Sequence, residues 1–197
     1  MAERTAEIKR KTKETDITLS LSLDGSGQFD VSTGIGMLDH MIEQLAKHGR
    51  FDIRLQATGD IDRDTHHLTE DVGIVLGQAF DKALGDRRGI TRFGDAIVPL
   101  DETLALVAID LSGRPHAEVA LEFDRDLIGE LPTENLWHLL ESFAKEGRLT
   151  LHFRLLSGSN DHHRAEAVFK ALARALRAAV SLDAAAAGDV PSTKDVL

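Results

Sequence analysis

Apolar and polar residues alternate as in strands along parts of the first half of the chain and recur at helical spacing in others. Alternation predicts strands at residues 16–27, which end in a glycine-rich turn, at 28–33 and at 50–59. Apolar residues three or four positions apart predict helices at 36–49 and 66–85, with Gly49 capping the first. The first half therefore predicts the order strand, strand, helix, strand, helix.

The second half repeats this order. It predicts two strands within residues 101–123, joined at 112–115, then a helix at 134–147, a strand at 148–158 and a helix at 162–180. Aligning "LDHMIEQLAKHG" with "LWHLLESFAKEG" also aligns the strands and helices that follow, which indicates an internal duplication. We expect an α+β fold built from a duplicated ββαβα unit, with two four-stranded sheets each backed by two helices. The repeats would span residues 1–88 and 89–183, and residues 184–197 would form a mobile C-terminal tail that closes over a ligand.

Composition narrows the class of protein. The chain has no cysteine, which excludes disulfides and thiolate metal sites and favours a reducing, cytoplasmic location. Its 33 acidic and 23 basic residues give a net charge of −10, which argues against nucleic-acid binding. Any bound anion must therefore meet a local basic pocket. No apolar run approaches the ~20 residues of a membrane span, so no membrane contact is expected.

Two similar clusters, "DTHHLTED" at 64–71 and "NDHHRAEA" at 160–167, occupy matching places in the repeats. Adjacent histidines on a helix point ~100° apart, so each pair is better placed to serve two metals than one. One further histidine precedes each cluster on the preceding helix. The candidate ligands are His40, His66, His67, Glu70, His138, His162, His163 and Glu166. This set would give four ligands to each of two metals, and it suits Mn²⁺, Fe²⁺, Co²⁺, Ni²⁺ or Zn²⁺.

The direction of these side chains bears on assembly. On a helical wheel, the first cluster lies roughly opposite the apolar stripe of its own helix, and the second lies on the flank of its stripe. We therefore expect the metals to lie between subunits of a homo-oligomer. The alternative is that the His pairs are ordinary polar residues at helix N-termini, capped by Asp64 or Thr65 and by Asn160 or Asp161.

The motifs "GIGMLDHM", "ATGDIDRDTHHLTEDVGIVLGQA" and "SGSNDHHRAEAVFKALARAL" closely resemble the imidazoleglycerol-phosphate dehydratase family, and the likeness runs over nearly the whole chain. The resemblance implies a hydro-lyase of histidine biosynthesis that converts D-erythro-imidazole-glycerol phosphate to imidazole-acetol phosphate and water. It also implies two Mn²⁺ ions per active site that bind the substrate imidazole, and a shell of 24 subunits. The chain carries no fused phosphatase motif and resembles the monofunctional form.

Carried over residue by residue, the resemblance makes the eight residues named above metal ligands. It places Glu14 of "KTKETDI" at the substrate as candidate acid/base, with Glu70 and Glu166 as further catalytic carboxylates. The phosphate would contact Arg92, Arg114, Ser192, Thr193 and Lys194.

Two other functions are compatible with the histidine and carboxylate clusters. A di-metal hydrolase uses similar ligands around a bridging water, and a non-catalytic assembly protein would use the metals only to hold subunits together. Dehydration yields a ketone, whereas hydrolysis would release phosphate or an amine, and an assembly protein would do neither.

Overall fold

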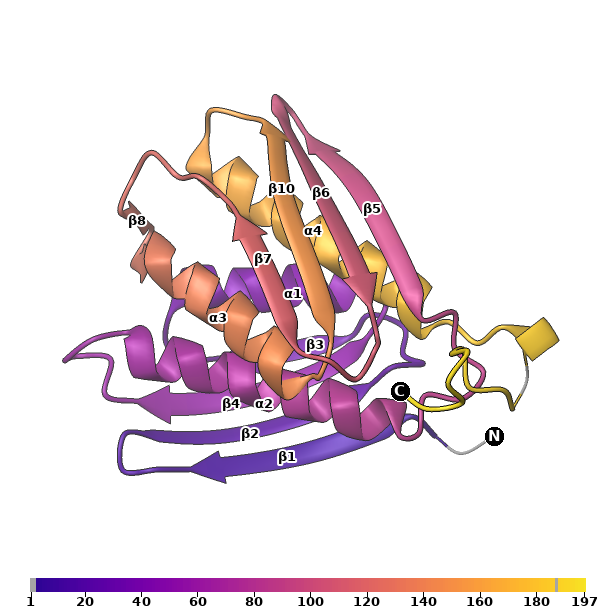
Figure 1. Ribbon diagram of the computed structural model, residues 1–197. Coiled ribbons are helices and arrows are strands. Elements are labelled where there is room, and N and C mark those ends of the chain that lie inside the picture. The colour runs from indigo at the N-terminus through magenta and orange to yellow at the C-terminus, as the bar shows by residue number, and fades with distance from the viewer. Residues whose placement is uncertain (1–2, 187) are drawn as a thin grey trace.

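The computed structural model describes residues 3–186 and 188–197 and arranges them in four layers, with two layers of helices enclosed between two sheets (Figure 1). The predicted α+β class and the two four-stranded sheets are confirmed. The strands of the first sheet are β1 (Thr5–Lys11), β2 (Thr15–Ser22), β3 (Phe29–Ser32) and β4 (Asp52–Gly59); those of the second are β5 (Phe93–Leu100), β6 (Thr103–Asp110), β7 (His116–Ala120) and β10 (Thr150–Ser157). The described α-helices are α1 (Gly36–Gly49), α2 (His66–Leu84), α3 (Thr133–Glu146) and α4 (Asp161–Val180). A short hairpin of β8 (Leu127–Ile128) and β9 (Leu131–Pro132) precedes α3, and one 3-10 turn, η1 (Ala184–Ala186), follows α4.

Both sheets have the same topology. The first has the order β1-β2-β4-β3 and the second β5-β6-β10-β7, and in each the last-named edge strand is parallel to its neighbour while the other pairs are antiparallel. The predicted ββαβα order is present in both halves, and one additional strand precedes it in each. These additional strands are β1 and β5, which lie at sheet edges, so each sheet reaches four strands. The shared order establishes the internal duplication.

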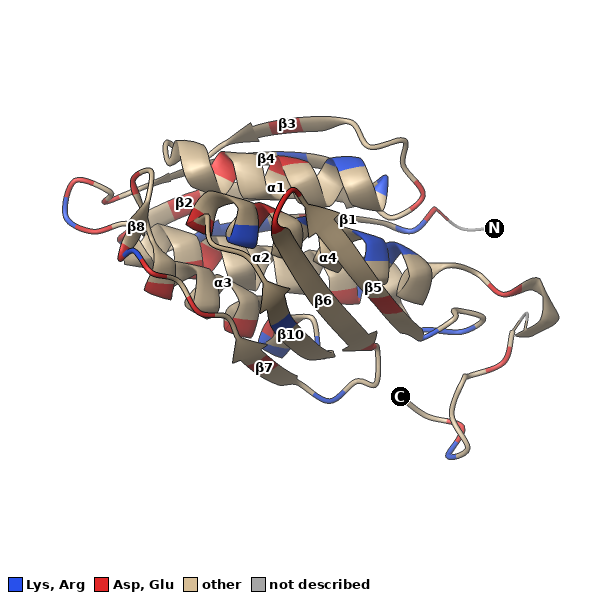
Figure 2. Cartoon of the chain, turned by 90° about the horizontal axis from the view of Figure 1, so that it is seen from above, with Lys and Arg blue, Asp and Glu red and all other residues tan. Residues whose placement is uncertain are grey.

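The helices form the interior. Helices α1 and α2 cover the first sheet, α3 and α4 cover the second, and the two layers meet where α2 packs on α3 and α1 packs on α4 (Figures 1 and 2). The α2–α3 contact is close because α2 presents glycines there. A Cβ atom at Gly73 would lie 2.6 Å from the carbonyl oxygen of Leu139, and one at Gly77 would lie 2.7 Å from the amide nitrogen of Gly147. Each repeat therefore packs its helices against helices of the other.

The helix ends differ in one respect from the sequence prediction. Gly49 is the last residue of α1, and the left-handed residue that follows is Arg50, with φ of 57°. A Cβ atom at position 49 would lie 2.3 Å from the ring of Phe51, which explains the glycine by packing rather than by capping. At the start of α4, the Asn160 side chain accepts hydrogen bonds from the amides of His162 and His163, so this His pair does lie at a capped N-terminus.

The segment after α4 returns to the start of the second repeat. Asp183 donates its amide to the carbonyl of Gly89 at 2.8 Å, and Gly89 donates to Asp189 at 2.8 Å. The Arg92 guanidinium donates to the carbonyl of Pro191 at 2.6 Å. This path brings the tail beside Gly89 and Arg92, just before β5. The mobility of the tail, and the repeat boundaries at residues 88 and 183, stay predictions.

A helix that crosses a bilayer needs a long apolar stretch. None of the helices within residues 3–186 and 188–197 has an apolar stretch long enough to cross a membrane.

Candidate metal centre and phosphate pocket

The two histidines of each pair face different surroundings. The first imidazole of each pair lies against a histidine from a helix of the other repeat, with ring centroids 4.7 Å apart for His66 and His138 and 5.5 Å apart for His162 and His40. The second imidazole points elsewhere, and its plane is nearly perpendicular to that of the first. The structure therefore joins the repeats through two histidine clusters within one chain. On the helical wheel the same side chains had no partner inside the chain, and the packing of α2 on α3 and of α1 on α4 supplies that partner.

The first cluster, His40–His162–Glu166, joins α1 and α4. One oxygen of Glu166 lies 3.4 Å from Nε2 of His40 and 3.1 Å from Nε2 of His162, and donor atoms of all three residues lie within 4.8 Å of one another. Lys170 contacts the other carboxylate oxygen at 2.7 Å. Burial raises the pKa of Glu166, but hydrogen bonds from Lys170 and His40 outweigh it and hold the pKa below its usual value. This carboxylate is therefore ionised and ready to bind a cation.

The second cluster, His66–His138–Glu70, joins α2 and α3 at the matching place, but its three donor atoms do not all come within the 4.8 Å of one another that the first cluster satisfies. Nε2 of His66 lies 3.8 Å from Glu70, whose side chain is 43% exposed, so this cluster is looser than the first. Nδ1 of His66 lies 3.2 Å from the amide oxygen of Asn135, a buried residue that also donates to Thr65. This contact orients the His66 ring with Nε2 toward Glu70.

The second histidine of each pair contacts a carboxylate. Nδ1 of His67 lies 3.2 Å from Asp60 and 4.0 Å from Glu14, and Nδ1 of His163 lies 2.8 Å from Glu102. These hydrogen bonds raise the pKa of His67 and of His163. Neither Asp60 nor Glu102 was identified from the sequence. Glu102 could have been found, because it occupies the place of Glu14 in the second repeat, whereas Asp60 is one of several acidic residues in its loop.

The residues that the resemblance implies to bind phosphate lie together around one cavity, apart from the histidine clusters. A cavity of about 680 Å³ is lined by Arg92, Arg114, Pro191, Ser192, Thr193 and Lys194. Arg92 is held by Asp110, with Nε and Nη2 donating at 2.7 and 3.1 Å. Arg114 is 71% exposed, so most of its guanidinium is available to a ligand. Three cations and two hydroxyls around one cavity give an acidic protein the local basic pocket that an anion requires.

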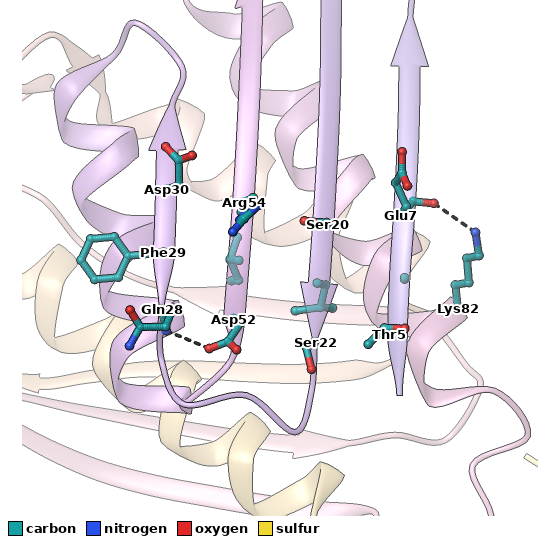
Figure 3. Close-up of a pocket in the computed structure, with 13 residues that line it drawn as sticks. Thr5, Glu7, Ser20, Ser22, Gln28, Phe29, Asp30, Asp52, Arg54 and Lys82 are labelled. Atoms are coloured by element: carbon teal, nitrogen blue, oxygen red, sulfur yellow. Dashed lines mark hydrogen bonds between the residues drawn. The ribbon is translucent and has the colours of Figure 1, made fainter. Parts of the chain in front are cut away.

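A larger hollow lies elsewhere and carries none of the expected site residues. It measures about 740 Å³ and lies on the outer face of the first sheet (Figure 3). Its side chains come from all four strands and from Lys82, which donates to the carbonyl of Glu7 at 3.0 Å. Its walls offer no histidine or cluster of cations, so we do not assign the chemistry to it.

The donor set of the two clusters fits a divalent metal. Imidazole nitrogens and carboxylate oxygens without sulfur suit Mn²⁺, Fe²⁺, Co²⁺, Ni²⁺ and Zn²⁺. The first cluster brings three donors together, fewer than an octahedral ion needs, so positions remain for a further protein ligand, water or substrate. Glu14, Asp60 and His67 also place one donor atom each within 4.8 Å of one another. In that group both carboxylates approach Nδ1 of His67, which leaves its Nε2 unused.

A duplicated α+β fold with sulfur-free His–His–Glu clusters at both helix contacts is typical of a metal-dependent enzyme. Comparison with known proteins agrees and is more specific. The family model for imidazoleglycerol-phosphate dehydratase matches residues 33–176. Dehydratases of this name from Dehalococcoides mccartyi and Xanthobacter autotrophicus are 58% and 55% identical, over 100% and 98% of this chain and 99% and 98% of their own lengths.

Solved structures show the same relationship. The crystal structure of imidazoleglycerol-phosphate dehydratase from Staphylococcus aureus has a TM-score of 0.82 at 34% identity, covering 91% of this chain and 99% of that one. The enzyme from Pyrococcus furiosus, solved in complex with (S)-C348, has a TM-score of 0.83 at 38% identity, covering 96% and 100%. The chain belongs to the imidazoleglycerol-phosphate dehydratase family. It is therefore a hydro-lyase of histidine biosynthesis, from a metal-dependent family that acts on a phosphorylated imidazole.

Proposed function

We propose that this chain dehydrates D-erythro-imidazole-glycerol phosphate to imidazole-acetol phosphate at a pair of Mn²⁺ ions held by the two histidine clusters. The observation that supports this most directly is the pair of equivalent clusters, His40–His162–Glu166 and His66–His138–Glu70, each formed by one helix from each repeat. Two equivalent clusters fit two metals better than one. The substrate carries an imidazole with two nitrogens, which suits a site with two cations.

We further propose that His67 and His163 complete these sites from neighbouring subunits. Their rings lie 6.1 and 6.3 Å from the first histidine of their own pair and are turned by 88° and 77° from it. Each is therefore poorly placed for the cluster of its own chain and free to serve another chain. Metals shared in this way require a homo-oligomer, for which the family resemblance suggests 24 subunits in the cytoplasm. Particle size measured by light scattering should fall when a chelator removes the metal; an unchanged size would contradict interfacial metals.

The chain's own residues have distinct tasks in the reaction. Bound manganese supplies a Lewis acid that polarises the substrate imidazole and stabilises negative charge on it. Glu14 is proposed to take the proton from the middle carbon of the substrate's three-carbon chain, since its side chain is 49% exposed and lies beside His67. The hydroxyl group on the carbon next to the imidazole departs as water, and the enol that remains becomes the ketone at the middle carbon. The residues of the proposed metal centre are His40, His66, His67, Glu70, His138, His162, His163 and Glu166.

The basic cavity is proposed to hold the substrate phosphate. Arg114 and Lys194 would contact its oxygens directly, and Arg92 would do so with the N–H groups that Asp110 and Pro191 leave free. Ser192 and Thr193 add hydroxyls from the tail. Because the tail is tied to the start of β5 through Gly89 and Arg92, a phosphate in this cavity would contact both segments.

Turnover separates this function from the two alternatives. Manganese-loaded protein is incubated with imidazole-glycerol phosphate, and both ketone formation and phosphate release are followed. Ketone without free phosphate is the expected result. Free phosphate would indicate a di-metal hydrolase. If protein with bound manganese forms neither product, a metal-dependent assembly protein is the remaining function.

A further inference from the structure

The internal duplication makes Glu14 and Glu102 equivalent residues. The β1–β2 hairpin pairs Lys11 with Asp16, and its turn contains Lys13 and Glu14; the β5–β6 hairpin pairs Leu100 with Thr103, and its turn contains Asp101 and Glu102. In both repeats the glutamate immediately precedes the second strand. It also lies near the second histidine of the pair that begins the repeat's last helix.

Despite this equivalence, the two carboxylates are bound very differently. One oxygen of Glu102 lies 2.8 Å from Nδ1 of His163, and the other accepts the amides of Ser159 and Asn160 at 3.1 and 2.9 Å. Glu102 is therefore fixed on three sides. The closest Glu14 oxygen lies 4.0 Å from Nδ1 of His67, beyond hydrogen-bond distance.

In the first repeat Asp60 takes the contact that Glu102 makes in the second. Asp60 follows directly after β4 and places its oxygens 3.2 and 3.3 Å from Nδ1 of His67. The residue that follows β10 is Gly158, where a Cβ atom would lie only 2.4 Å from Oγ1 of Thr103. No carboxylate fits there, so in the second repeat the hairpin glutamate is left to contact the histidine.

We propose that Glu102 and Asp60 are positioning residues that hold His163 and His67 in the tautomer with the proton on Nδ1, so that Nε2 is free to bind metal. This inference rests on the metal centre of the proposed function and adds two residues to it. A metal-binding histidine commonly donates its other N–H to a carboxylate, which fixes the ring and raises the basicity of the ligating nitrogen. Glu14, relieved of this task by Asp60, keeps an exposed carboxylate for the substrate.

The Glu102→Gln variant distinguishes a role in positioning His163 from a role that only supports the fold. The amide oxygen of Glu102→Gln can still accept the N–H groups of Ser159 and Asn160, so the start of α4 is preserved. The amide NH₂ then faces Nδ1 of His163, which must become an acceptor, and the proton moves to Nε2. That tautomer offers no lone pair to the metal from Nε2. The Glu102→Ala variant leaves Nδ1 of His163 to solvent, so both tautomers of His163 remain accessible.

The experiment is a manganese titration of the full-length protein, in which free Mn²⁺ is measured by its electron paramagnetic resonance signal. Glu102→Gln should weaken one of the two classes of metal site by roughly 10–100-fold, the usual effect of disturbing a residue that orients a metal ligand. Glu102→Ala should weaken the same class by less. Thermal unfolding of the metal-free proteins should show the opposite order, with alanine the less stable. Equal affinity in all three proteins, or a larger loss for alanine, would overturn the proposal.

Matched variants make the assignment specific. Asp60→Asn should weaken the other class of site, because it acts on His67, and a loss at the class affected by Glu102→Gln would contradict the proposed division. Glu14→Gln should leave both affinities unchanged while turnover falls by roughly 10²–10⁴-fold. Failure of the proposed dehydration would be seen separately, as wild-type protein that binds manganese but forms no ketone. The ranking of manganese affinity among the Glu102 variants would still decide the positioning role.

Discussion

The two repeats share a fold, but the arginine that precedes the first strand has different surroundings in each. Arg4, before β1, donates to both oxygens of Asp24 and to the carbonyl of Val180, and its side chain is 14% exposed. The hydrogen bonds from Arg4 hold the pKa of Asp24 below its usual value despite partial burial. Arg92, at the equivalent place before β5, is bound to Asp110, but its surroundings open into the basic cavity.

The loops after the second strands explain the difference. In the first repeat this loop carries Asp24 and is fixed by Asp52, which accepts the amides of residues 26, 27 and 28 at 2.8, 3.0 and 2.8 Å. In the second repeat the same loop carries Ser112 and Arg114, and Thr150 takes the place of Asp52. Two acids therefore close one end of the molecule. At the other end Arg92 is likewise 14% exposed and held by Asp110, but Arg114 is 71% exposed. The proposed phosphate contacts therefore depend on these few side chains rather than on the fold.

The comparison predicts equal effects where the repeats are equivalent. His162→Ala and His66→Ala each remove one imidazole from a cluster, and each should lower kcat/KM by roughly 10³-fold or more, as loss of an essential group does. Steady-state kinetics and bound manganese, measured after gel filtration, check this. His152→Ala, on the outer face of the second sheet, is the control and should change neither. Near-normal turnover in either cluster variant would show that the other cluster alone supplies the metal centre.

Substituting the arginines at the two ends of the molecule, Arg4 and Arg114, should have unequal effects. Arg114→Ala should raise the KM for imidazole-glycerol phosphate roughly 10–100-fold, since hydrogen bonds to a charged group contribute about 1.5–3 kcal/mol. Arg4→Ala should leave KM unchanged and lower the thermal midpoint, because it breaks contacts inside the protein. Equal changes of KM in the two variants would contradict the assignment of the phosphate to the second repeat.

The smallest effect concerns the loop that Asp52 closes. Hydrogen bonds from the amides of residues 28, 26 and 27 lower the pKa of Asp52 in the folded protein, against a weaker opposing effect of burial. A lowered pKa stabilises the folded state above the unfolded value of 3.8, and this contribution is lost as the pH falls through the folded value. Asp52→Asn should therefore lower stability by about 1 kcal/mol, or roughly 2–4 °C in thermal midpoint, at pH 7.

The same difference should shrink as the pH falls below 3.8, where Asp52 is protonated in the unfolded state before it is protonated in the folded one. Circular dichroism melts from pH 3 to pH 7 measure it. Thr150→Val removes the hydrogen bond from the equivalent position to the carbonyl of Arg114 and should give a difference that does not vary with pH. A pH-independent effect of Asp52→Asn would show that the loop is held by something other than this charge.

Much of the fold could be predicted because the apolar pattern repeats. The sequence missed the short hairpin β8–β9 and the strands β1 and β5. Strands β1 and β5 lie at sheet edges, where one neighbour suffices and fewer positions are buried, and Lys9 and Lys11 on β1 resemble a charged terminus. Spacing identified the cluster histidines, but it could not show that His40 meets His162 and His66 meets His138 within one chain. That pairing depends on how α1 packs on α4 and α2 on α3. The contacts of Asp60 and Glu102 likewise depend on tertiary structure.

The packing of α1 on α4 and of α2 on α3 has an evolutionary consequence. A single repeat has one helix of each kind, so alone it could form neither cluster, but two identical copies would form both across their contact. The fused chain therefore has the arrangement expected of a homodimer whose gene was doubled. Fusion released the two copies from the need to be identical. One end could then become closed through Arg4 and Asp24, while the other kept the cavity around Arg92 and Arg114 that we propose binds the phosphate.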